Sequence, residues 1–235
     1  MREQRIAFTI IIIFVLGLAM TYSQRPILAD QANLQTDNNV SFLWAFGAIK
    51  KTNQELQFIK ITRDTELKSG DQLKMLVRLN KKCFVYVFYY SSQGQLFMLL
   101  PYNLNQFSTD YETSKNYYIP QGNFVLELDD NVGQEKFYLI ASAQRLQELE
   151  NLFGSYESAE DFKKPEFIEN IIHEIRQLRK RHKKFTTEAE RPIASTGSIR
   201  AHIISEQAGL PDLDKFAVQI DAESFFAKTF TIDHR

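Results

Sequence analysis

The sequence predicts a mainly β protein with α structure: an antiparallel β-sandwich-like domain with a two-helix excursion at about residues 143–184. In residues 41–143, short apolar or alternating segments are separated by turn residues, as expected for antiparallel strands. Two amphipathic helical segments follow, and the strand pattern then resumes. The C-terminal strands are therefore expected to return to the sheet. Hydrophobic residues fill 44% of the 235 positions, which suffices for a sizeable core.

The first three strands are expected at residues 41–50, 55–62 and 72–80. In the first, large side chains alternate at Phe42, Trp44 and Phe46. The third follows a Ser69-Gly70-Asp71 turn and alternates well, as in a strand with one buried face. Its apolar face carries Leu73, Met75, Val77 and Leu79, and its other face carries mostly Gln72, Lys74, Arg78 and Asn80.

The uncharged stretch CFVYVFYYSSQGQLFMLLPY, residues 83–102, predicts a β-hairpin with strands near 83–90 and 95–100. The turn cluster SSQGQ contains Gly94, which can adopt a positive φ. Because the arms have about eight and five apolar residues, they are far shorter than a membrane span of roughly 20. The first arm should be a central strand that is covered on both sides. One face carries Phe84, Tyr86, Phe88 and Tyr90, and the other carries Cys83, Val85, Val87 and Tyr89.

The remaining segments are expected to be loops, strands and two helices. A polar loop at 103–116 precedes three strands that end near residue 143. The first helix is expected to stop at Gly154, and the second covers 164–185 with Pro165 in its first turn. We predict that this helix packs on one face of the sheet through Phe167, Ile171, Ile175 and Leu178. A loop at 186–198 is followed by expected strands at 199–204, 215–223 and 225–234.

The N-terminus carries an export pattern. Arg2 and Arg5 precede fifteen uncharged, largely apolar residues, as in a secretory signal peptide. The alternative is an uncleaved membrane anchor, because this run is close to the length of a spanning helix. Residues 1–29 are thus predicted to be a signal peptide or an N-terminal anchor, 30–40 a linker, and 41–235 a single β-rich domain with a helical insertion. The protein is expected to be exported, either periplasmic or secreted after cleavage or anchored in the membrane.

Short motifs in residues 55–150 resemble a bacterial family of domains of unknown function, DUF4384. The motifs are Ser69-Gly70-Asp71, the aromatic strand Phe84 to Phe88, Gln93-Gly94, Leu99-Leu100-Pro101, Ile119-Pro120, Gly133 with Glu135, and Ile140-Ala141-Ser142. Cys83-Phe84 departs from the family, which commonly has Gly or Tyr there. The resemblance implies an exported or envelope-associated module, and it supplies no catalytic residues.

Composition and motifs exclude several classes of site. The 28 basic and 29 acidic residues lack the basic excess of a dedicated nucleic-acid binder. The single Cys83 excludes an intramolecular disulfide and a cysteine zinc cluster. His173-Glu174 is no HExxH motif, since Gln177 occupies the position of the second histidine. The Asp129 to Asn131 segment is interpreted as an Asx-type turn rather than a calcium loop. No catalytic, cofactor-binding or metal-binding residue is expected.

The leading functional hypothesis is an exported, non-catalytic envelope module that displays loops and strand edges to a protein or polymer partner. The alternative is a carbohydrate-active or hydrolytic enzyme or accessory domain, which a cleft with two carboxylates or a histidine–acid pair would favour. Membrane contact is expected only through the N-terminal segment, if it is uncleaved. The possible interaction surface is Tyr102, Phe107 and Tyr111 in the loop 101–117, and Arg176, Arg179, Lys180 and Arg181 on the second helix. The loop could equally pack its own aromatics, and the basic residues could simply stabilise the C-terminal end of the helix.

Overall fold

The computed structural model describes residues 38–52, 55–182, 190–192, 203–204 and 213–235. The chain divides into two units, Met1–Gln35 and Thr36–Arg235, and all described residues belong to the second. The expected signal peptide or anchor lies outside the described residues. Within them, none of the helices has the length and apolarity needed to cross a membrane.

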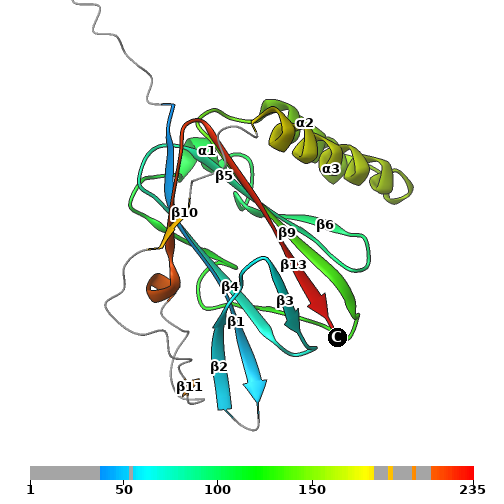
Figure 1. Cartoon of the computed structure of the whole chain (residues 1–235). Helices are drawn as coiled ribbons and strands as arrows, with labels where there is room; N and C mark the ends of the chain where they lie inside the picture. The colour runs from blue at the N-terminus through cyan, green and yellow to red at the C-terminus, as the bar shows by residue number, and fades with distance from the viewer. Residues whose placement is uncertain (1–37, 53–54, 183–189, 193–202, 205–212) are drawn as a thin grey trace, which may run out of the picture. The chain divides into compact units, whose positions relative to one another are not determined.

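The described residues form a mainly β fold with two sheets (Figure 1), which confirms the predicted fold class. In the first sheet, β1 is flanked on one side by β12 and β2 and on the other by β4, whose far edge carries β7 and β8. Its strands are β1 (Val40–Thr52), β2 (Glu55–Lys60), β4 (Gln72–Leu79), β7 (Asn116–Ile119), β8 (Leu126–Glu127), β10 (Glu190–Pro192), β11 (Ile203–Ile204) and β12 (Val218–Ala222).

The second sheet has the order β3-β13-β9-β5-β6, with only the β3–β13 pair parallel. Its strands are β3 (Asp64–Leu67), β5 (Phe84–Tyr90), β6 (Leu96–Leu100), β9 (Gly133–Ser142) and β13 (Phe225–His234). The predicted hairpin is therefore β5–β6, with Gly94 in its turn at φ +77°. The C-terminal segment returns to both sheets, as expected, because β12 joins β1 and β13 joins β9.

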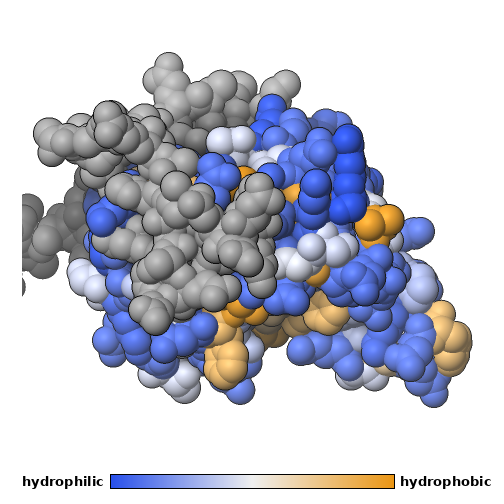
Figure 2. Space-filling view, turned by 90° about the horizontal axis from the view of Figure 1, so that it is seen from below, coloured by the Kyte–Doolittle hydropathy of each residue, from blue (hydrophilic) through white to orange (hydrophobic). Residues whose placement is uncertain are grey.

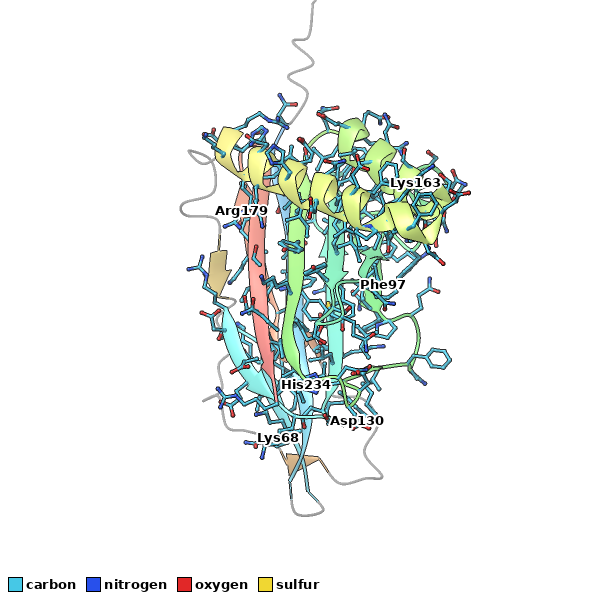
Figure 3. The ribbon with its side chains drawn as sticks, turned by 90° about the vertical axis from the view of Figure 1, so that its right-hand side faces the viewer. Lys68, Phe97, Asp130, Lys163, Arg179 and His234 are labelled. Atoms are coloured by element: carbon cyan, nitrogen blue, oxygen red, sulfur yellow. The ribbon has the colours of Figure 1, made fainter. Side chains whose placement is uncertain are left out.

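Helices cover the outer face of the second sheet at one end (Figures 1 and 3). The helical segments are α1 (Gln106–Thr109), α2 (Gln147–Ser158), the 3₁₀ turn η1 (Asp161–Lys163), α3 (Lys164–Arg181) and the 3₁₀ turn η3 (Leu213–Phe216). The two-helix excursion is thus confirmed. η3 lies instead on the first sheet, where Leu213 packs in a small cluster with Phe58.

The main core fills the space between the two sheets. Aromatic rings cross it, for example Phe46 against Phe137 with 5.0 Å between ring centroids. The strand faces that point into this core are the ones predicted. From β4 they carry Leu73, Met75, Val77 and Leu79. From β5 they carry Val85, Val87 and the half-buried Tyr89, and Cys83, which directly precedes the strand, is buried beside them. The opposite face of β5 contacts the helices, so this strand is covered on both sides.

The long helix packs on the sheet through a slightly different stripe from the one predicted. Ile171, Ile175 and Leu178 are buried there, whereas Phe167 is half-buried and Ile168 is the buried residue of that first turn. Both sets have the three- and four-residue steps of one helix face, so the spacing alone does not distinguish Phe167 from Ile168. The prediction that this helix packs on the sheet is therefore correct for Ile171, Ile175 and Leu178 and wrong for Phe167.

Other local predictions also differ from the structure. α2 continues through Gly154 to Ser158, because a glycine inside a helix costs only about 1 kcal/mol and does not by itself end the helix. The polar loop at 103–116 contains the short α1. β3 was missed, and of the expected strand at 199–204 only β11 lies within the described residues.

Lys74 is the clearest error in the predicted faces. Its side chain was expected to be solvated, yet the residue is only 1% exposed. Its ammonium donates to the carbonyls of Pro120 (2.6 Å), Gly122 (2.8 Å) and Phe124, which belong to the segment between β7 and β8. This segment covers the lysine, and its three carbonyls replace water as hydrogen-bond acceptors.

Candidate functional site

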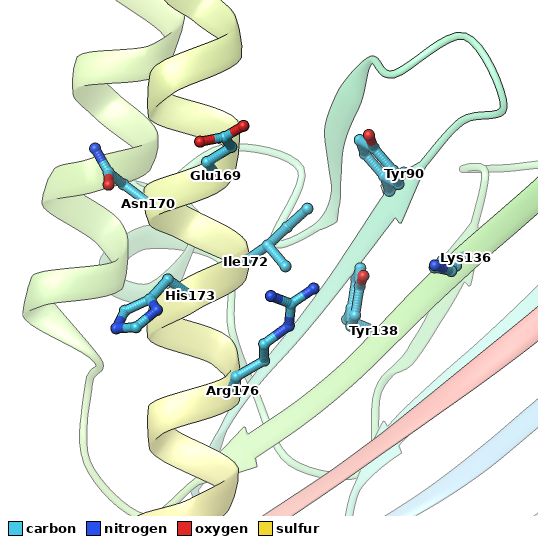
Figure 4. Close-up of a pocket in the computed structure, with 8 residues that line it drawn as sticks. All are labelled: Tyr90, Lys136, Tyr138, Glu169, Asn170, Ile172, His173 and Arg176. Carbon is cyan, nitrogen blue, oxygen red and sulfur yellow. The ribbon is translucent and has the colours of Figure 1, made fainter.

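A groove of about 550 Å³ lies between α3 and the outer face of the second sheet (Figure 4). Strand alternation places its sheet wall: residues 136 and 138 of β9 face the helices, and Tyr90 of β5 lies directly opposite Lys136. Helix periodicity places its other wall, since 169, 172, 173 and 176 have i, i+3, i+4 and i+7 spacing. The lining residues are Tyr90, Lys136, Tyr138, Glu169, Asn170, Ile172, His173 and Arg176.

The two walls bring polar groups of different kinds together. Figure 4 shows Arg176 reaching from α3 toward Tyr138, and Ile172 extending toward Tyr90. In the same view, Asn170 and His173 point away from the strands. His173 has a partner on its own helix, because its Nε2 lies 3.2 Å from Gln177 Nε2.

The groove carries an excess of positive charge. Lys136 and Arg176 face one lining acid, Glu169. Within the described part of the chain, neither cation forms an ion pair or a hydrogen bond, nor do the hydroxyls of Tyr90 and Tyr138. Burial raises the pKa of Tyr138, and the charges of Arg176 and Arg179 partly oppose that shift. At neutral pH the Tyr138 hydroxyl therefore keeps its proton and can donate a hydrogen bond.

The strand residues that line this groove belong to a segment that matches a known family model. Residues 66–145 match the family model of a domain of unknown function, DUF4384. The match lies within the predicted span of about 55–150 and runs from β3 through β9. It includes Tyr90, Lys136 and Tyr138, whereas α3 lies outside it. No curated protein and no solved structure matches the chain.

The four basic residues of α3 that were predicted as a possible interaction surface have different surroundings in the structure. Arg176 lines the groove, while Arg179 donates to Thr229 Oγ1 on β13 at 3.1 Å. Arg181 pairs with the buried carboxylate of Glu174 at 2.6 Å, and Lys180 is exposed. Only Arg176 of the four is thus brought to the candidate site. A role for the others in binding stays a prediction.

The aromatic residues of the predicted interaction loop turn inward. Phe107 is buried among the rings of Phe84, Tyr86 and Tyr111. The Tyr102 hydroxyl donates to the Tyr118 carbonyl at 2.6 Å, and the Tyr111 hydroxyl accepts the Val85 N–H at 2.9 Å. This arrangement matches the alternative in which the DUF4384 loop packs its own aromatics. Contact between its exposed parts and a partner stays a prediction.

A second constellation joins two DUF4384 motifs that are far apart in the chain. Ser69 Oγ lies 3.1 Å from His234 Nε2, and His234 Nδ1 lies 3.8 Å from Glu135 Oε1. His234 and Glu135 are both buried, at the end of the fold far from α3 (Figure 3). The other Glu135 oxygen accepts the backbone N–H of Ser92 at 3.0 Å. Sequence reasoning missed this cluster, although Ser69 and Glu135 both stand in motifs of the family resemblance.

The described residues contain no group of three or more His, Cys, Asp or Glu side chains that could hold a metal ion. The Asp129 carboxylate accepts the Asn131 N–H at 2.8 Å, which is the Asx-type turn expected from the sequence. Figure 2 shows a mostly hydrophilic surface with separate apolar patches on the face seen from below. Large exposed apolar side chains are Phe97, Phe124, Val132 and Phe162.

Proposed function

We propose that this DUF4384-containing protein is an exported, non-catalytic module of the bacterial envelope that binds a protein or polymer partner. One observation carries the proposal. The groove between α3 and the second sheet presents Lys136, Arg176 and two tyrosine hydroxyls, and none of them has a hydrogen-bonding or ionic partner among the described residues. Such convergent polar groups in a concave surface are typical of ligand sites.

Export is supported by the sequence pattern of the N-terminus. Arg2 and Arg5 followed by an uncharged apolar run direct a chain to secretion. In this proposal the N-terminal segment either is removed or holds the protein at the membrane, and the β-rich unit acts outside the cytoplasm.

Site-specific photo-crosslinking in the bacterial host tests the proposal. A photoreactive amino acid is placed at Glu169, on the rim of the groove, or at Asp130, which is exposed at the far end of the fold (Figure 3). We expect one discrete adduct from position 169, none from position 130, and recovery of the adduct in the envelope or secreted fraction. Recovery only from the cytosol, or the same adducts from both positions, would overturn the proposal.

A hydrolase is the second candidate, and the Ser69–His234–Glu135 cluster favours it. The Ser69 hydroxyl is exposed and within reach of a histidine base, which in turn lies beside an acid. It ranks second because 3.8 Å between His234 Nδ1 and Glu135 Oε1 exceeds a hydrogen bond. A fluorophosphonate probe that labels the protein but not its Ser69→Ala variant would move the hydrolase to first place. Absence of labelling would remove it.

A further inference from the structure

We infer that the groove beside α3 is a binding site for an oxyanion group, a carboxylate or a phosphate, with Arg176 and Lys136 as its cationic ligands. The inference rests on the proposed function, since it names the chemistry by which that partner would be held. Three features of the groove support it: its charge, the geometry of its donors, and the contrast with the other basic residues of α3.

The charge of the groove is unbalanced. Two cations approach it from separate elements, Lys136 from β9 and Arg176 from α3, and Glu169 is the one acid in its lining. Arg176 is exposed and Lys136 half-buried, so both are accessible to an anion from solvent, and an anion held between the two walls would be attracted by both. A site of this kind attracts an anion more strongly than an exposed flat surface does.

The donors also suit an oxyanion. A guanidinium offers parallel N–H groups that match the two oxygens of a carboxylate or a phosphate. Lys136 and Tyr138 stand two residues apart on the same face of β9, about 7 Å along the strand. Tyr138, whose raised pKa keeps its hydroxyl protonated, supplies a neutral donor beside Arg176.

The neighbouring arginines on α3 have polar partners within the protein, unlike Arg176. Arg181 is paired with Glu174, and Arg179 donates to Thr229. Arg176 stands one turn before Arg179 on the same helix, yet it has no such partner within the described residues. Its available guanidinium is therefore a property of the groove rather than of the helix as a whole.

Calorimetric titration of the full chain at low ionic strength tests the site. The probes are inorganic phosphate, glucuronate as a carboxylate, and glucose as the matched neutral sugar. We expect saturable binding of phosphate or glucuronate and no binding of glucose. Binding of glucuronate alone would identify a carboxylate site, and binding of phosphate alone a phosphate site. If neither anion binds, the inference is wrong.

Variants assign the binding to the groove. Arg176→Gln and Lys136→Gln are each expected to lower the affinity for the anion at least tenfold. Tyr138→Phe is expected to lower it severalfold. Lys68→Gln removes an exposed cation at the other end of the fold (Figure 3) and should leave the affinity unchanged. Circular dichroism confirms that each variant is folded. Equal losses in Lys68→Gln and Arg176→Gln would show nonspecific attraction and overturn the site.

The two proposals fail in different ways. If the photo-crosslinked adduct at position 169 persists in Arg176→Gln while anion binding is absent throughout, the oxyanion site is wrong and the interaction module stands. If anions bind in the groove but no adduct forms there, the module's partner is not held at this surface.

Discussion

Tyr86 on β5 donates its hydroxyl proton to the carboxylate of Glu150 on α2, with 2.6 Å between the two oxygens. The same hydroxyl accepts the backbone N–H of Leu146 at 3.0 Å, and Arg145 donates to Glu150 through Nε at 3.1 Å. Tyr86 and Glu150 are both buried. One polar network thus fixes the start of α2 against the middle of the second sheet.

Removal of this hydroxyl should loosen the junction between α2 and β5. We expect Tyr86→Phe to lower the free energy of unfolding by about 1.5–3 kcal/mol, because a buried carboxylate loses a donor. The control is Tyr156→Phe on α2, since that hydroxyl forms no hydrogen bond within the described residues. Urea denaturation measures both variants. Equal midpoints for the two would show that the Tyr86–Glu150 bond contributes nothing to stability.

Substitution by alanine at two glycine positions should change the stability of the fold in opposite directions. A Cβ at Gly47 on β1 would lie 2.0 Å from Cζ of Phe58, whose ring packs against Phe216. Gly47→Ala must displace that buried ring, and we expect a loss of about 1–3 kcal/mol. Gly154 is inside α2 with no atom within 4 Å of an added Cβ, so Gly154→Ala should raise stability by about 0.5–1 kcal/mol. Thermal unfolding that shifts in the same direction for both would contradict this assignment.

The parts of the fold that could be predicted depend on local periodicity. The β5–β6 hairpin was recognisable because both faces of its first arm are apolar and its turn contains Gly94. The stripe on α3 was recognisable in the same way. β3 gave no such signal, because its four residues pair in parallel with β13, more than 160 positions away in the chain. A strand held by distant backbone pairing leaves little pattern in its own side chains.

The candidate site could be predicted only in part. Arg176 was selected as one of a basic run, but its separation from Arg179 and Arg181 depends on which way each side chain leaves the helix. Lys136 and Tyr138 were read simply as parts of a strand. Their relation to α3 depends on how the helix lies across the sheet, which no local pattern specifies.

Lys74 should act as a structural residue of the first sheet. Its buried ammonium donates to the carbonyls of Pro120, Gly122 and Phe124, so Lys74→Met would leave those carbonyls without their donor. We expect a loss of about 2 kcal/mol or more and faster amide hydrogen exchange in residues 121–124. The matched control is Lys82→Met at an exposed position. Unchanged exchange in that segment would show that the lysine does not order it.

The free energy of unfolding should decrease at alkaline pH, and ionisation of the Cys83 thiol should contribute to this decrease at the lowest pH. Burial raises the pKa of the Cys83 thiol from 9.0 to about 12, and burial raises the pKa of Tyr102 from 10.0 to about 12. A group whose pKa is raised on folding contributes stability that is fully present below its unfolded pKa and is lost as pH rises toward the folded pKa. The loss from Cys83 therefore begins near pH 9, and that from the tyrosine near pH 10.

Between pH 9 and 10 the thiol and the buried tyrosines both contribute, so the thiol's share is measured as the difference between the wild-type protein and Cys83→Ala. The thiol alone should lower the folding equilibrium constant there by up to about tenfold per pH unit. Cys83→Ala has a lower stability throughout, since a buried side chain is truncated, but its stability should fall less steeply from pH 9 to 10 than that of the wild-type protein. Urea denaturation at pH 8, 9, 10 and 11 compares the slopes rather than the levels. Parallel curves for the two proteins would mean that another group causes the alkaline loss.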